Sequence, residues 1–291
     1  MQLSKHHGLG NDFLVVLDEV NGRALAITGD DAVRLCERRT GIGADGLLHG
    51  SAPATDPDAG PDVTLDADVV MRLFNADGSR AEMSGNGIRC FGQAVAAARG
   101  ITAGTLRVLT DDGIKVLEIE PGGVTGEVLV SVDMGTARPG PAIPEGLDLP
   151  GRHHTVDMVN PHLVVEVPDP WAVDVAEVGA AIERRFPDGV NVEFIAARGS
   201  DHLDLAVWER GAGVTRACGT GACAAASVAS GWGLVGHDVV VTMPGGDATV
   251  ELTSDGRLQL TGPSVLIASL EVDASASTDA SVSSDSMAVS A

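Results

Sequence analysis

Cys218 lies in the glycine-rich segment ACGTGAC, directly before a run of small apolar residues. The run predicts a helix, and glycines at the start of a helix let an anion approach its unpaired backbone N–H groups. The pKa of a cysteine is about 8.5 in water and falls beside the positive end of a helix. The segment therefore predicts a thiol suited to proton transfer at the N-terminus of a helix.

A second segment of the same type, SGNGIRC, begins at residue 84. Aligning the two segments places Ser84, Gly85, Asn86 and Gly87 against Cys218, Gly219, Thr220 and Gly221, and an alanine-rich run follows in both. The offset of 134 residues is about half of the structured chain. Glycine-rich helix starts are common, but the matching side chain, glycine spacing and helix together favour an internal duplication.

Two such helix starts can hold one carboxylate from both sides and place residues 84 and 218 on opposite faces of the bound molecule. This arrangement suits inversion of a carbon that carries a carboxylate. One side chain removes the α-proton and the other delivers a proton to the opposite face. The backbone N–H groups stabilise the charge that develops on the carboxylate oxygens.

Strands and helices can be predicted around these two segments. Short apolar or alternating runs predict strands over Phe13–Leu17, Val69–Phe74, Thr105–Leu109, Ile114–Ile119, Val128–Met134, Leu163–Val167, Val192–Ala196, Leu203–Val207, Val239–Met243, Ala248–Leu252 and Leu258–Thr261. A helix is predicted over Asp30–Arg39, with an N-cap at its Asp-Asp pair and a basic last turn. Two more are predicted over Ile88–Arg99 and Ala222–Ser230, ending at Gly100 and Gly231.

A stretch rich in proline and glycine over residues 135–150 predicts the boundary between two halves. We expect an N-terminal half over residues 1–135 and a C-terminal half over residues 136–263. Ser51–Asp68 is predicted to be an acidic surface loop. Residues 273–291 are low in complexity and are predicted to be a disordered tail.

Charge and hydropathy exclude several classes of partner. The chain has 41 acidic and 19 basic residues and a formal net charge of −22, which disfavours binding to nucleic acid or anionic membranes. No run approaches the ~20 apolar residues of a membrane helix, and the first residues lack a secretory signal, so we expect a cytoplasmic protein. The acidic composition has two interpretations: the usage of a high-GC genome, which we favour, or adaptation to high salt.

The four cysteines indicate neither a disulfide framework nor a metal site. Their spacing lacks the pairs typical of zinc ligands, and disulfides are not expected in a cytoplasmic chain. Cys90 and Cys223 lie in alanine-rich stretches and are predicted to be buried in helices. Cys218 differs from them because of its glycine-flanked position.

Six motifs together resemble the diaminopimelate epimerase family over about residues 1–271. They are GLGNDF (8–13), RRTGIGADG (38–46), FNADGSRAEMSGNGIR (74–89), NPH (160–162), NVEF (191–194) and WERGAGVTRACGTGACA (208–224). The resemblance implies an α/β (α+β) fold of two pseudo-symmetric halves, each a rolled sheet or barrel around a central helix, with a final strand over residues 264–272 returning to the first half. It also implies interconversion of LL- and meso-diaminopimelate by a homodimer, without pyridoxal phosphate, another cofactor or a metal.

The resemblance assigns site residues as well. Cys218 corresponds to one of two catalytic cysteines of the family, and His162 to a histidine near the thiols. Backbone cradles for the reacting carboxylate fall at Gly85–Asn86 and Gly219–Thr220, and polar substrate contacts on Asn11, Asn75, Asn160, Asn191, Glu209 and Arg210. An arginine recognises a carboxylate bidentately and Glu209, also a catalytic candidate, can pair with an ammonium group. Requiring both at the distal end of the substrate would reject amino acids with one carboxylate.

The match departs from the family at Ser84, where the second catalytic cysteine is expected. A hydroxyl is far less acidic than a thiol, and Cys90 lies about 240° around the helix from position 84, so it cannot replace that thiol. Ser84 has three explanations: an engineered substitution that traps a complex, a natural functional variant, or a protein that binds without turnover. We favour the natural variant because the surrounding motif is undisturbed.

Two other functions remain open from the sequence. One is a different amino-acid epimerase or isomerase of the same superfamily, such as a hydroxyproline-type enzyme. The other is a catalytically silent protein that binds diaminopimelate. The pair Glu209-Arg210 and the asparagines favour a substrate with two amino-acid ends.

Overall fold

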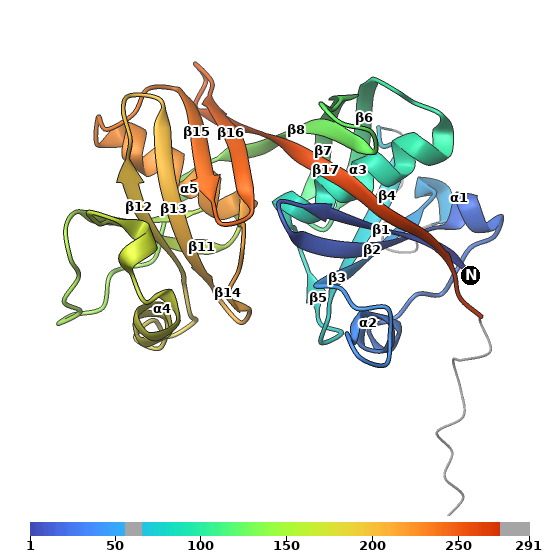
Figure 1. Cartoon of the computed structure of the whole chain (residues 1–291), viewed down its shortest axis with the longest axis horizontal. Coiled ribbons are helices and arrows are strands. Elements are labelled where there is room, and N and C mark those ends of the chain that lie inside the picture. The colour runs from blue at the N-terminus through green and yellow to red at the C-terminus, as the bar shows by residue number, and fades with distance from the viewer. Residues whose placement is uncertain (56–65, 274–291) are drawn as a thin grey trace, which may run out of the picture.

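The structure is a computed structural model and describes residues 1–55 and 66–273. Figure 1 shows two lobes, in each of which strands wrap around one central helix. The long strand β17 (Arg257–Glu271) crosses from one lobe to the other. Two pseudo-symmetric halves of mixed α and β structure, each rolled around a helix, are therefore confirmed.

The first lobe is a closed ring of eight strands around α3 (Gly85–Arg99). In order of pairing they are β1 (Gln2–Gly8), β2 (Asn11–Leu17), β3 (Gly46–Ser51), β4 (Val69–Asn75), β6 (Gly104–Thr110), β7 (Gly113–Pro121), β8 (Glu127–Thr136) and β17, which pairs with β1. Ile88, Phe91 and Val95 of the helix are buried against this ring. Gly92 is needed for the close fit, because a Cβ there would lie 2.7 Å from the Leu117 side chain.

The second lobe repeats the strand order of the first lobe, with α5 (Gly219–Gly231) as its central helix. Its strands are β10 (His153–Asp157), β11 (Pro161–Glu166), β12 (Asn191–Ala197), β13 (His202–Glu209), β15 (Asp238–Met243), β16 (Gly246–Leu252) and the first part of β17. The parallel pair β11–β12 starts with His162 opposite Asn191, as β2–β3 starts with Phe13 opposite Gly46. Buried alanines fill α5, so it fits a core almost without aromatic residues.

Smaller elements complete the two lobes. They are the strands β5 (Arg80–Ala81), β9 (Arg138–Pro139) and β14 (Gly213–Val214), the helices α1 (Asp18–Asn21), α2 (Gly29–Cys36) and α4 (Val175–Glu183), and 3₁₀ turns at Pro53–Thr55 and Pro170–Ala172. Within the described ranges, no helix has the length and hydropathy needed to cross a membrane.

The predicted helix over Asp30–Arg39 is wrong at both ends. The N-cap is Thr28, because its side chain and that of Asp31 bond to each other's backbone N–H groups in a capping box. The helix ends at Cys36, and Glu37 is extended. Arg38 therefore lies outside the helix, where its guanidinium bonds to acidic side chains at the cavity described below.

The helices α3 and α5 confirm the other two predictions and begin three residues earlier than predicted. Each of the eleven predicted strands overlaps an observed one, whereas β1, β3, β10 and α4 were not predicted. The predicted loop Ser51–Asp68 is wrong at its start, since Ser51 closes β3. Residues 56–65 of that loop and 274–291 of the predicted tail lie outside the described residues, and the boundary at residues 135–136 stays a prediction.

Candidate functional site

Ser84 and Cys218 are the N-cap residues of α3 and α5. The Ser84 Oγ accepts a hydrogen bond of 3.0 Å from the Gly87 N–H, and the Cys218 Sγ accepts one of 3.3 Å from the Gly221 N–H. Both residues have extended backbones, so the next N–H groups of each helix remain free to meet an anion. The predicted reactive positions therefore have matching local structure in the two lobes.

The two helix starts meet at their glycines. A Cβ built on Gly85 would lie 3.1 Å from the Gly219 Cα, and one on Gly219 would lie 2.9 Å from the Leu260 side chain. Only glycine permits this approach of the two backbones. The N–H groups of both helices therefore lie at one place, where they can act on one carboxylate.

A cavity of about 740 Å³ opens at this junction. Its lining includes most of the predicted site residues: Asn11, Asn75, Ser84, Gly85, Asn86, Asn160, Glu209, Arg210, Cys218, Gly219 and Thr220. His162 and Asn191 do not line it, although the sequence assigns them to the site. Both are buried behind its wall, where Asn191 accepts a hydrogen bond from the Arg210 N–H and so fixes the backbone of that arginine.

His162 belongs to a buried polar chain next to the thiol. Its Nδ1 lies 2.6 Å from the Glu193 Oε1, and its Nε2 lies 2.8 Å from the Asn160 Oδ1. A Cβ on Gly221 would lie 2.8 Å from the same Glu193 oxygen, so this carboxylate packs under the first turn of α5. The histidine therefore acts on the site through Asn160, which lines the cavity.

The expected lowering of the Cys218 pKa is wrong. Burial, followed by the charges of Glu209 and Glu193, raises the pKa well above its usual value, and the hydrogen bonds from Thr220 and Gly221 oppose this only in part. The Cys218 thiol is thus protonated at rest. Burial also raises the pKa of Glu209, while hydrogen bonds from Thr215 and Cys218 counteract the effect. The thiol and the carboxyl group form a pair that can share a proton.

This position of Glu209 differs from the sequence interpretation, which places it with Arg210 at the distal end of a substrate. The Glu209 carboxylate accepts a hydrogen bond from the Thr215 hydroxyl and lies beside Cys218. The Arg210 guanidinium is directed elsewhere and donates to the Asp188 carbonyl. Of the two residues, Arg210 is the exposed one, and Glu209 belongs to the group around the Cys218 thiol.

Four charged residues at the cavity and one behind it were not among the predicted site residues. Arg38, Asp45, Asp77 and Arg216 line the cavity, and the Asp45 carboxylate accepts hydrogen bonds from Asn11 and Arg38. All four lie within the motifs RRTGIGADG, FNADGSRAEMSGNGIR and WERGAGVTRACGTGACA, but a motif alone does not show which of its charged side chains face the cavity. Glu193 could have been found, since it is the one charged residue in the apolar run VEFIA. The prediction that Cys90 and Cys223 are buried helix residues is confirmed.

Comparison with known proteins decides the family. The family described as diaminopimelate epimerase matches residues 3–139 and 154–267. A diaminopimelate epimerase of Synechococcus elongatus is 39% identical over 285 residues, covering 92% of this chain and 96% of the relative. One of Bacteroides thetaiotaomicron is 40% identical over 274 residues, covering 92% and 96%. The chain belongs to the diaminopimelate epimerase family.

The fold also agrees with a solved structure. A predicted epimerase from Pseudomonas aeruginosa superposes with a TM-score of 0.70 at 17% identity, covering 93% of this chain and 98% of the other. In this member of the diaminopimelate epimerase family, the N-cap of α3 is a serine, Ser84, and the N-cap of α5 is a cysteine, Cys218. The site therefore combines two chemically unequal groups in a nearly symmetric frame.

Proposed function

We propose that this protein interconverts LL- and meso-2,6-diaminopimelate by proton removal and re-addition at the α-carbon, without pyridoxal phosphate. The observation that carries the proposal is the pair of N-cap side chains, Ser84 and Cys218, at one cavity with the touching helix starts between them. This geometry supports one bound carboxylate with a proton-transfer group at each helix start. The reaction belongs to the synthesis of lysine and of peptidoglycan precursors.

The reaction begins with the reacting carboxylate in the N–H cradles at Gly85–Asn86 and Gly219–Thr220. The Cys218 thiol passes its proton to Glu209, and the thiolate removes the α-proton. The electron pair of the broken C–H bond spreads onto the carboxylate, where the N–H donors stabilise it. The Ser84 hydroxyl delivers its proton to the opposite face, and the alkoxide regains a proton from solvent. Glu209 releases to solvent the proton that it received from Cys218, which restores the starting state. The reverse direction uses the same groups in the opposite order.

Recognition of the remote amino-acid end is assigned to Arg210, with the amides of Asn11 and Asn75. Arg210 is exposed and lines the cavity, and its guanidinium can bind a carboxylate bidentately. Asn191 holds its backbone N–H at 2.8 Å. A substrate without the second carboxylate leaves this cation without its partner and binds less tightly.

A substrate screen tests this proposal. Deuterium incorporation at the α-carbon is measured for LL-diaminopimelate and for trans-4-hydroxyproline under the same conditions. Exchange of the first alone supports the proposal, and exchange of the second alone assigns a hydroxyproline-type epimerase instead. Calorimetric binding of diaminopimelate without any exchange would identify a silent binding protein.

We further propose a homodimer in the cytoplasm. The four free cysteines of the described chain fit a reducing compartment.

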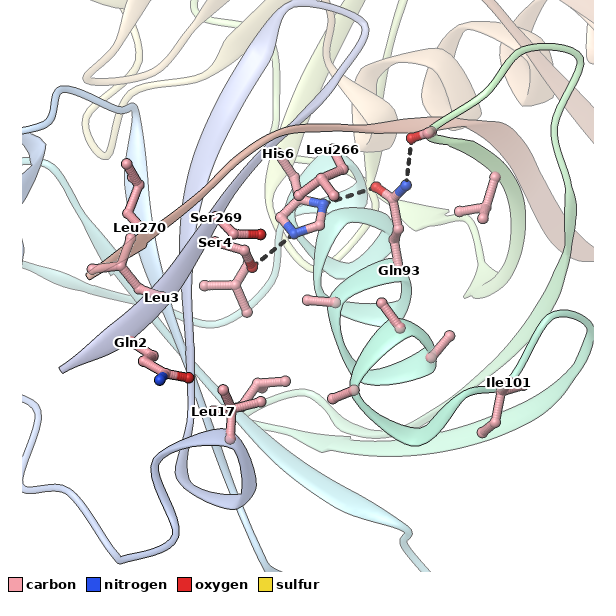
Figure 2. A pocket seen from close by; sticks show the side chains of 18 of the residues that line it. Gln2, Leu3, Ser4, His6, Leu17, Gln93, Ile101, Leu266, Ser269 and Leu270 are labelled. Carbon is pink, nitrogen blue, oxygen red and sulfur yellow. Dashed lines mark hydrogen bonds between the residues drawn. The ribbon is translucent and has the colours of Figure 1, made fainter.

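A second cavity, of about 730 Å³, opens between β1, β17 and the end of α3, with His6 bonded to Gln93 on its floor (Figure 2). Leu266 lines this apolar opening and Ile267 follows it, and they are 39% and 50% exposed. A second copy of the chain would cover this surface, and sedimentation of the purified protein tests it.

A further inference from the structure

Arg89 is a fully buried arginine in the first turns of α3, and its exposed fraction is 0%. Its guanidinium donates to the Gly85 carbonyl at 2.9 Å and to the Asn86 Oδ1 at 2.7 Å. Backbone encloses it closely, because a Cβ on Gly8 or Gly262 would come within 3.3 Å of the guanidinium. It does not line the cavity, but it contacts the two residues that form one N–H cradle.

This guanidinium has no counter-ion in the part of the chain that the structure describes. Among residues 1–55 and 66–273, no carboxylate forms an ion pair with Arg89, and its Nε has no hydrogen-bond partner. Burial lowers the pKa of Arg89 to about 10, so the group still carries its charge at neutral pH. The nearby thiols of Cys90 and Cys223 supply no negative charge, because burial raises the pKa of each to about 12. A buried cation in this state is costly, and proteins usually pair one.

The position of Arg89 relates it to both helices. The offset that aligns Ser84 with Cys218 aligns Arg89 with Cys223, and these two residues lie near each other in the structure. One lobe therefore supplies an arginine where the other supplies a small neutral side chain. The single charge lies beneath two helix N-termini, each of which carries a partial positive charge. The Glu193 carboxylate packs under the first turn of α5, but among residues 1–55 and 66–273 neither it nor another carboxylate forms an ion pair with Arg89.

Arg89 also fixes the side chain that joins the two lobes. The Asn86 oxygen accepts from Arg89, which leaves the Asn86 amide nitrogen to donate to the Ala217 carbonyl at 2.9 Å and to the Asn11 Oδ1 at 3.2 Å. Ala217 directly precedes Cys218. The guanidinium therefore sets the orientation of an amide that holds the thiol-bearing segment against α3.

We propose that Arg89 is a positioning residue whose unpaired buried charge is balanced by the reacting carboxylate, and more strongly by that group once the α-proton has left. The inference rests on the proposed function. The bound carboxylate carries one negative charge, and the intermediate carries a second one spread over the same oxygens. A fixed cation below the cradle stabilises the second state more than the first, which raises kcat rather than affinity alone.

The test compares Arg89→Met with Arg89→Lys, and uses Cys223→Ala as a control for a change of packing at the equivalent position. Exchange of the α-proton of LL-diaminopimelate gives kcat and KM, and thermal unfolding reports the fold. For Arg89→Met we expect kcat to fall by roughly 10²-fold and KM to change by less than tenfold, with a melting temperature equal to or above that of the unmodified protein. Arg89→Lys keeps the charge and should recover at least a tenth of the activity.

Three results would overturn the inference. The first is an unchanged kcat in Arg89→Met, and the second is an equal loss of kcat in Arg89→Met and Arg89→Lys. The third is a loss of activity in Arg89→Met accompanied by a loss of thermal stability, with both losses also seen in Cys223→Ala. If the unmodified protein exchanges no α-proton, the proposed function fails independently of this inference. Calorimetric titration with meso-diaminopimelate then decides, since removing the charge must still weaken carboxylate binding by at least severalfold in Arg89→Met and not in Arg89→Lys.

Discussion

Ser84 and Cys218 cap their helices in the same way, yet their surroundings differ in charge. Each side-chain acceptor bonds to the N–H group three residues later, at 3.0 Å for Ser84 and 3.3 Å for Cys218. The charges of Glu209 and Glu193 raise the pKa of the Cys218 thiol. In the first lobe, the position equivalent to His162 at the start of the parallel strand pair is occupied by the apolar Phe13. Acid–base assistance is therefore concentrated at the cysteine.

Ser84→Cys should raise the rate of α-proton exchange, because a thiol transfers a proton at a much lower energetic cost than a hydroxyl. We expect kcat to rise by roughly 10²-fold with little change in stability, since the N-cap hydrogen bond to Gly87 can be kept by sulfur, as at Cys218. Deuterium incorporation followed by NMR measures it. A variant slower than the unmodified chain would show that Ser84 is adapted to this site.

Glu209→Gln should lower activity and raise stability at neutral pH. The pKa of Glu209 is raised in the folded protein, so the unfolded chain loses its proton first as the pH rises above about 4.5. The unmodified protein therefore loses stability over the interval between the unfolded and folded pKa values, and the glutamine variant does not. The melting temperature of the variant minus that of the unmodified protein should therefore increase from pH 4 to pH 8. The kcat of the variant should be lower by roughly 10²-fold. A constant difference across this range would contradict the assignment.

Gly219→Ala should push the two helix starts apart. Its Cβ would lie 3.0 Å from the Gly85 Cα and 2.9 Å from Leu260, and overpacking of this kind costs about 1–3 kcal/mol. We expect a lower melting temperature and a higher KM. Gly231→Ala, at the other end of the same helix, is the matched control because its Cβ meets open space. Equal effects of the two substitutions would show that the close approach is unimportant.

Val159→Gly should stabilise the protein. Val159 has φ +82°, a left-handed conformation that β-branched residues rarely adopt, directly before Asn160. Such strain costs about 1–3 kcal/mol, and glycine removes it at a smaller entropic cost. The free energy of unfolding in denaturant should rise by about 1 kcal/mol. Gly100→Val, at φ +67° in open space, should lower the free energy of unfolding by a similar amount. A lower free energy of unfolding in Val159→Gly would mean that the packing of the valine side chain stabilises the fold by more than the backbone strain costs.

Much of this architecture could be predicted, because the repeated helix starts and the alternating runs are local signals. The helix α4 escaped prediction although Asp174 caps it and Val175, Val178 and Ile182 share one face, since Gly179 interrupts the pattern. That glycine is explained only by the fold, as a Cβ there would lie 2.5 Å from Trp208. Strand β3 was hidden because it is buried on both faces and short.

The site was predictable where a backbone motif defines it and less so where charge does. The N-cap positions follow from glycine spacing, but the raised pKa of Cys218 depends on carboxylates that reach it from β12 and β13. The lack of an ion-pair partner for Arg89 among the described residues likewise depends on which side chains the second lobe packs against it. Such effects come from tertiary contacts between different strands and helices, which no local sequence pattern contains.

The most direct test of the account is α-proton exchange in deuterated water with LL-diaminopimelate, measured for the unmodified protein and for Cys218→Ala. We expect exchange by the unmodified protein and a loss of at least 10³-fold in Cys218→Ala, with thermal unfolding showing that the fold is retained. Exchange that continues unchanged without the Cys218 thiol would contradict the central claim that this helix-capping cysteine transfers the proton.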